Sequence, residues 1–167
     1  MKGVSTVKHC AHLNGRVFVI ILCGLIPVLS LLGCGKGNVL AKKGESPYAI
    51  VLSGNPSPSE RHAAKELQSH IQLANGAQLA IVSESDERAQ QPPRIFIGFG
   101  GASEKVLSGG KPVNPDSLGD EGFIIRTIPA PGGSPDIIIA GGRPRGTLYG
   151  VYTFLDRLGF RWYTNRV

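Results

Sequence analysis

The sequence has little cysteine, and none of it lies beyond residue 34. Its three cysteines are Cys10, Cys23 and Cys34, so residues 35–167 contain no thiol. This absence excludes a disulfide, a thiolate metal ligand and a cysteine nucleophile from the longer part of the chain. A fold formed there has to be stabilised by its hydrophobic core alone.

The first 33 residues also lack acidic side chains. Three basic residues, Lys2, Lys8 and Arg16, precede the apolar run 17–32, which is the order of the n-region and h-region of a signal peptide. The run contains a glycine, a proline and a serine, and it is shorter than the roughly 20 residues that a membrane-spanning helix needs. A cleaved leader is therefore favoured over a permanent span.

Residues 31–34 read Leu-Leu-Gly-Cys, which resembles the lipobox of bacterial lipoproteins. The resemblance implies that 1–33 is a lipoprotein signal peptide and that Cys34 becomes the diacylated first residue. Each buried CH₂ contributes about 0.8 kcal/mol, and stable anchoring takes more than one acyl chain. We expect an exported protein, lipid-anchored to the bacterial cell envelope, with the membrane as a partner. An ordinary signal peptide and an uncleaved anchor are the alternatives.

Basic side chains are dispersed in the rest of the chain. Without the leader, 15 Lys and Arg face 12 Asp and Glu, a net charge of about +3. No basic stripe of the kind that nucleic-acid binders carry is visible, so we expect no nucleic-acid partner. The length remaining is enough for one domain with a substantial core.

Composition and apolar patterning predict a flexible tether over 34–46 and one folded domain over 47–167. The best helix signal starts at Ser57, with Pro58 at the first helical position, Glu60 completing a capping box and Gly76 after the last turn. A second helix is expected over 145–158, with a short helical turn at 103–107. Strands are predicted at 48–52, 78–83, 94–98, 122–128, 136–140 and, at the end, 160–163.

This order of elements predicts the α+β class, an α/β sandwich. We expect a mixed, mostly antiparallel sheet of five or six strands, because the short connection between 122–128 and 136–140 suggests a hairpin. Two main helices should cover one face of that sheet.

Four stretches, in their order and spacing, resemble the N-terminal accessory domain of α-glucuronidases and β-N-acetylhexosaminidase-like glycoside hydrolases. They are 57–82, 94–100, 118–127 and 136–163. The resemblance implies a non-catalytic sandwich that packs beside a (β/α)₈ barrel carrying the catalytic carboxylates. The chain given ends at Val167, where the connection to that barrel would begin, so we expect either a piece of a longer glycosidase or a stand-alone module.

The most prominent carboxylate pair is Asp120 and Glu121. A glycosidase needs two carboxylates about 5 to 9 Å apart. Adjacent residues at a strand start point to opposite faces, so a solvated strand entry is favoured. We therefore predict no catalytic residue in this chain.

His62, Glu66 and His70 recur every four residues along the first helix, and all three are potential metal-ligand types. Their spacing is not that of the H-E-x-x-H zinc motif, so a solvated face with Glu–His pairs is favoured. We predict neither a metal site nor a cofactor.

The stretch Gly98-Phe99-Gly100-Gly101 follows a strand and precedes a helical turn, a context in which glycines cradle phosphates. Ser103 stands where the third glycine of a dinucleotide fingerprint would be. Turn geometry accounts for these glycines without a ligand, and this interpretation is favoured.

The loop 141–146 places Arg143 and Arg145 at the start of the second helix, where an anion such as a uronic-acid carboxylate could bind. The favoured alternative is a tight turn whose arginines pair with acidic groups of a neighbouring barrel. Trp162 and Tyr163 could stack on a sugar ring, but packing or a domain interface is the more usual role of such residues. If the module normally packs against a barrel, the isolated chain should expose an apolar patch around Phe160, Trp162 and Tyr163.

The leading hypothesis is a non-catalytic N-terminal module of a lipid-anchored glycoside hydrolase, which supports or orients a catalytic barrel against polysaccharide. The alternative hypothesis is a stand-alone carbohydrate-binding surface lipoprotein that uses the 141–146 loop and the nearby aromatic residues.

Overall fold

A computed structural model describes residues 39–107 and 113–163. The predicted leader and Cys34 lie outside these ranges. The elements follow one another as β1 (Ala49–Leu52), α2 (Pro58–Asn75), β2 (Ala80–Ser83), the 3₁₀ helix η1 (Glu87–Gln90), β3 (Arg94–Ile97), α3 (Gly101–Leu107), the 3₁₀ helix η2 (Pro115–Leu118), β4 (Phe123–Ile128), β5 (Asp136–Gly141) and α4 (Gly146–Arg157).

The five strands form one mixed sheet in the order β2-β1-β3-β5-β4, which confirms the predicted class. The prediction of mostly antiparallel pairing is wrong, because three of the four strand pairs are parallel and only β4 and β5 form the expected hairpin. Between β1 and β2 the chain crosses over through α2. Between β2 and β3 it crosses back through η1, a 3₁₀ turn that the polar composition of 84–93 did not indicate.

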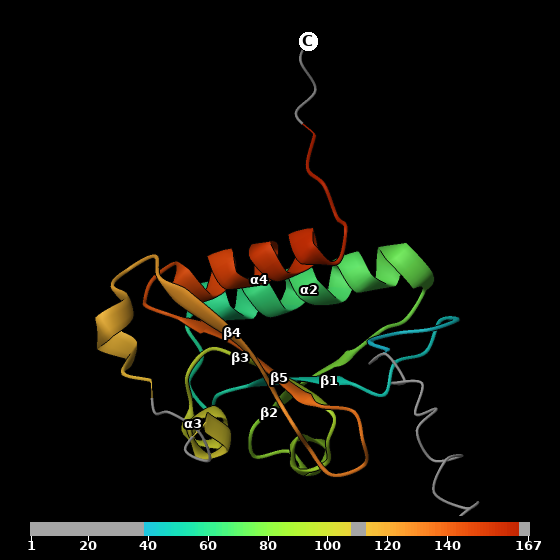
Figure 1. The fold of residues 1–167 in the computed structure, drawn as a ribbon, viewed down its shortest axis with the longest axis horizontal. Helices are drawn as coiled ribbons and strands as arrows, with labels where there is room; N and C mark the ends of the chain where they lie inside the picture. The colour runs from blue at the N-terminus through green and yellow to red at the C-terminus, as the bar shows by residue number, and fades with distance from the viewer. Residues whose placement is uncertain (1–38, 108–112, 164–167) are drawn as a thin grey trace, which may run out of the picture. The chain divides into compact units, whose positions relative to one another are not determined.

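Helices α2 and α4 lie side by side over one face of the sheet, as predicted (Figure 1). Period-two alternation directs the side chains of Ile50, Ile95 and Ile139 toward this helical layer. Leu67 of α2 and Leu155 of α4 meet them and are fully buried. Most of the domain's apolar burial lies in this layer, so the helix pair and the sheet stabilise each other.

The intervening strand residues face the opposite side of the sheet. There Val51, Phe96 and Ile138 form a smaller core with Leu107 of α3 and Ala89 of η1. Strands buried on both faces are nearly continuous apolar runs, as β3 and β5 are.

The capping signals of α2 are confirmed. The Ser57 side chain accepts a hydrogen bond from the Glu60 amide, and the Glu60 carboxylate accepts one from the Ser57 amide. Gly76 ends the helix at a φ of 83°, a left-handed conformation that favours glycine. The second predicted helix is confirmed as α4, and the helical turn at 103–107 is the end of α3.

Two boundaries differ from expectation. Residues 160–163 are not a strand, because they pair with none of the five strands of the sheet. Residues 39–46 are not a free tether either. Leu40 and Ala41 pack against the main core, and the Ser46 hydroxyl donates to the Leu40 carbonyl. Within the described ranges, no helix has the length and apolarity that crossing a bilayer requires.

A buried ion pair joins the start of β3 to the start of β5. The Arg94 guanidinium donates to Asp136 Oδ2 at 2.5 Å, and the Arg94 amide donates to Asp136 Oδ1 at 2.8 Å. The Asp136 side chain is 3% exposed and that of Arg94 15%. Removing one charge from such a pair leaves the other buried without compensation.

We therefore expect Asp136→Asn to lower the free energy of unfolding by about 3 kcal/mol. Urea unfolding followed by circular dichroism measures this loss. The matched control is Asp156→Asn, which breaks the exposed pair of Asp156 with Arg161 at 2.8 Å and should cost less than about 1 kcal/mol. Equal losses in the two variants would contradict a structural role for the buried pair.

Candidate functional site

The carboxyl ends of β1, β3 and β5 and the N-termini of α2 and α4 meet at one edge of the sheet. Strands β2 and β3 lie on opposite sides of β1, so the strand order reverses at this edge. Ligands of open α/β sheets bind at such reversals. A hollow of about 470 Å³ lies here, lined by Glu60, Phe99, Glu104, Asp116, Gly119, Asp120, Gly141, Gly142 and Arg143.

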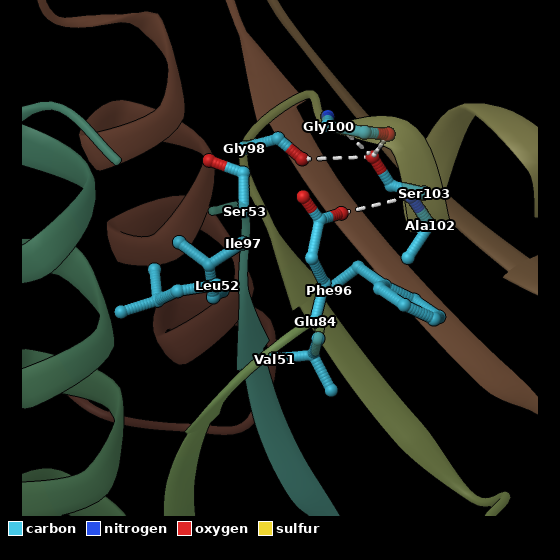
Figure 2. Close-up of a pocket in the computed structure, with 10 residues that line it drawn as sticks. All are labelled: Val51, Leu52, Ser53, Glu84, Phe96, Ile97, Gly98, Gly100, Ala102 and Ser103. Atoms are coloured by element: carbon cyan, nitrogen blue, oxygen red, sulfur yellow. Dashed lines mark hydrogen bonds between the residues drawn. The ribbon is translucent and has the colours of Figure 1, made fainter. Parts of the chain in front are cut away.

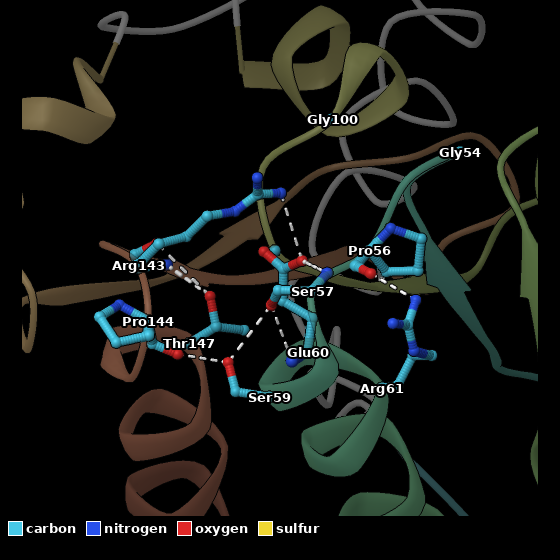
Figure 3. Close-up of polar contacts among 12 residues, drawn as sticks. Gly54, Pro56, Ser57, Ser59, Glu60, Arg61, Gly100, Arg143, Pro144 and Thr147 are labelled. Carbon is cyan, nitrogen blue, oxygen red and sulfur yellow. Dashed lines mark hydrogen bonds and ion pairs between the residues drawn. The ribbon is translucent and has the colours of Figure 1, made fainter.

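Glu60 is the buried carboxylate of this edge, with a side chain that is 3% exposed. Its Oε2 accepts a hydrogen bond from the Ser57 amide at 2.6 Å and lies 3.5 Å from Arg143 Nη2 (Figure 3). The Ser59 hydroxyl donates to the carbonyl of Pro144 beside it. These contacts attach the start of α2 to the loop between β5 and α4.

Two glycines of the edge have no room for a side chain. Gly98 has a φ of 86°, and a Cβ atom there would lie 2.5 Å from Glu60 Oε1. A Cβ atom at Gly142 would lie 1.5 Å from the Gly119 carbonyl oxygen. The glycines that suggested ligand loops are therefore needed for close packing between loops.

The two arginines of the loop have carboxylate neighbours from this chain. Arg143 is near Glu60, and Arg145 Nη1 lies 4.0 Å from Glu121 Oε1, with both guanidinium groups more than half exposed. The other charged groups that line the hollow are carboxylates, so an anionic sugar would meet repulsion as well as Arg143. This distribution of charge favours a structural role for the arginines.

The predicted strand entry at Asp120 and Glu121 is a turn, and both side chains are exposed. The Asp120 carbonyl accepts hydrogen bonds from the amides of Arg145 and Gly146, at 3.2 and 3.0 Å. The backbone of this turn thus holds the first residues of α4, and Asp120 is among the residues that line the hollow.

A carboxylate of the protein itself lies beside the glycine-rich stretch after β3. Glu84 Oε1 accepts from the Gly54 amide at 2.8 Å. Glu84 Oε2 accepts from the Ala102 amide at 2.9 Å (Figure 2). The Ser103 hydroxyl contacts Gly98 and Gly100. The space left between these groups is about 10 Å³, room for no more than one water molecule. Glu84 therefore occupies the position that a phosphate would need.

The His62, Glu66 and His70 row belongs to an aromatic cluster on the outer side of the helix pair. Glu66 Oε2 accepts a hydrogen bond from the Tyr152 hydroxyl of α4 at 3.1 Å. His70 lies edge-on to Phe160 and within 5.7 Å of Trp162, and Trp162 lies edge-on to Tyr152 at 5.3 Å. Across the described ranges, no three His, Cys, Asp or Glu residues converge as metal ligands.

The contacts within this aromatic cluster were not predicted from the sequence pattern. The spacing along α2 shows that its two histidines and Glu66 share one side of the helix. Tyr152 lies 86 positions after Glu66, and no local sequence signal indicates that the two residues are in contact. The loop arginines and the aromatic residues also do not form one site. Arg143 and Arg145 precede the twelve-residue helix α4, about 18 Å long, whereas Trp162 and Tyr163 follow it.

The family model described as glycosyl hydrolase family 67 N-terminus matches residues 36–154, from before β1 into the last turn of α4. The chain belongs to this family. No curated protein matches it. The α-glucuronidase part of the resemblance is thus confirmed, whereas the match gives no link to β-N-acetylhexosaminidases. A family 67 N-terminal domain is an accessory module of a glycoside hydrolase, and its relatives carry a catalytic domain in the same chain.

The geometry of Glu60 predicts an unequal effect of removing the two members of its ion pair. Glu60→Ala removes the acceptor of the Ser57 amide and should lower the free energy of unfolding by about 2 kcal/mol. Arg143→Ala removes an exposed partner and should cost less than about 1 kcal/mol. Urea titration of both variants tests this order, and a larger loss in the arginine variant would contradict it.

Burial raises the pKa of Tyr152 above its ordinary value of 10.0, and the hydrogen bond to Glu66 and its negative charge raise it further. The folded state thus favours the neutral phenol, and this stabilisation is lost as the pH rises through the folded-state pKa. We expect Glu66→Gln to lower the pKa of Tyr152. Tyrosinate absorbance, taken as a difference from Tyr152→Phe, measures the shift, and an unchanged value in the glutamine variant would exclude the Glu66 contact.

Proposed function

We propose that this chain is the non-catalytic N-terminal module of a lipid-anchored glycoside hydrolase and that it supports and orients a catalytic barrel acting on polysaccharide. The match to family 67 N-terminal domains over residues 36–154 is the observation that carries the proposal. The lipid anchor goes beyond that match and rests on the sequence of residues 1–34, and the polysaccharide role rests on the resemblance to glycoside hydrolases.

The use of the polar groups at the sheet edge supports a scaffold. Glu60 caps α2 and contacts the loop before α4, and Glu84 joins the loop after β1 to the start of α3. These carboxylates hold backbone in place, whereas a glycosidase needs two that flank a substrate. A domain whose loops are fixed in this way can present its last helix and the segment after it in one orientation.

The proposed lipid anchor rests on the sequence of residues 1–34. The basic start, the apolar run and the Leu-Leu-Gly-Cys end of residues 1–34 support diacylation of Cys34. Two acyl chains are enough to hold a protein of this size on a membrane.

Acylation is tested by expressing the chain in a bacterium fed with an alkyne-bearing fatty acid. We expect the wild type to be labelled and Cys34→Ser to carry no label. Cys23→Ser is the matched control, since it removes a thiol from the apolar run and should leave labelling intact. Label that persists in the serine variant at position 34 would refute the proposed anchor.

The barrel is tested separately, on the gene. The reading frame should continue past the codon of Val167 into a barrel-coding sequence. A stop codon there, with no barrel-coding frame downstream, would refute support of a barrel in the same chain and leave the acylation result unaffected.

A further inference from the structure

Trp162 is an exposed ring with a fixed orientation. The residue is 49% exposed. Tyr152 contacts it edge-on at 5.3 Å with an interplanar angle of 86°, and His70 lies against it at 5.7 Å and 58°. These two neighbours come from different helices, α4 and α2, so the indole is held from two directions and still keeps surface toward solvent.

Polar groups continue the surface beside this ring. The Tyr152 hydroxyl, which donates to Glu66 Oε2, links the aromatic rings to the carboxylate. Glu66 Oε1 lies 3.9 Å from His62 Nε2, and the side chains of Glu66 and His62 are 27% and 56% exposed. A carboxylate accepts several hydrogen bonds, and Tyr152 uses part of that capacity. The rest, with the exposed imidazole, is available to hydroxyl groups from solution.

A flat apolar ring beside hydrogen-bonding groups is the combination that binds a pyranose. The C–H bonds on one side of the sugar ring carry partial positive charge and meet the negative π-face of an indole, while its hydroxyls need polar partners at the edge. We propose that Trp162, Glu66 and His62 form a binding site for a neutral pyranose unit of an oligosaccharide. The inference goes beyond the proposed function, because it requires neither an anchor nor a barrel.

The local charges select a neutral sugar. A uronic acid would bring its carboxylate toward that of Glu66, and like charges at short range repel. Arg161, which adjoins Trp162 in the sequence, contacts Asp156 Oδ1 at 2.8 Å and so has its own counter-ion. Neutral rings are therefore expected to bind in preference to acidic rings of the same size.

The chain contains a single tryptophan, so tryptophan fluorescence, excited at wavelengths where tyrosine does not absorb, reports on this site alone. The purified full-length chain, kept in detergent micelles, is titrated with cellohexaose as the neutral probe and with hexagalacturonate as the acidic probe. We expect a saturable change in tryptophan emission with cellohexaose and at least roughly fivefold weaker binding of hexagalacturonate. Equal affinity for both probes would overturn the selection of a neutral ring.

Variants separate the proposed contacts, with affinities measured by calorimetry and folding checked by circular dichroism. Trp162→Ala should weaken cellohexaose binding by roughly tenfold, about the contribution of one aromatic stacking contact. Glu66→Gln keeps an acceptor and should reduce the preference for the neutral probe more than the affinity for it. Leu73→Ala is the control, since Leu73 is an apolar residue of the same helix with 83% exposure, and it should change neither value.

Two further results would overturn the proposal. The first is no fluorescence change and no heat with cellohexaose at millimolar concentration. The second is concentration-dependent self-association of the chain that Trp162→Ala abolishes, with no response to sugar, because the ring would then be a protein contact. An unchanged affinity in a folded Trp162→Ala variant would likewise exclude stacking on this indole.

Discussion

The buried carboxylate of Glu60 is the group on which the carboxyl edge of the sheet depends. It accepts the amide of Ser57 and so starts α2, and it approaches Arg143, which precedes α4. It also packs so closely against Gly98 that the chain leaving β3 has no space for a side chain. One charged group thus fixes the positions of three segments that are far apart in the sequence. A partner domain that docks here would meet a surface already in its final shape.

The same principle gives a structural role to several motifs that resemble ligand sites. Glu84, an anion that the protein itself supplies, accepts the amides of Gly54 and Ala102 beside the glycines after β3. The arginines after β5 face carboxylates of the same chain. Helix N-termini and guanidinium groups attract negative charge wherever it comes from. In this domain the charge is internal, and it joins loops together. That use fits an accessory module of a glycoside hydrolase, which is the family that the chain belongs to.

The parts of the structure that follow from local patterns could be predicted from the sequence. The capping box at Ser57 and Glu60 and the left-handed Gly76 predict the limits of α2, and the isoleucines of β3 and β5 predict buried strands. The parallel pairing could not be predicted, because it depends on crossing connections, one of them a 3₁₀ turn in a polar stretch. The contacts of Glu66 with Tyr152 and of His70 with Trp162 join residues that meet only once α2 and α4 have packed. A helical wheel shows which residues share a face, and it contains no information about the neighbouring helix.

If Cys34 carries the proposed acyl anchor, the contacts of Leu40 with the core limit how far the domain can lie from the lipid surface. Cys34 and Leu40 are six positions apart, and six residues span at most about 20 Å even when fully extended. With an acyl anchor at Cys34, the domain would therefore stay close to the lipid surface. An enzyme attached in this way could cut only those glycan chains that come within reach of that surface.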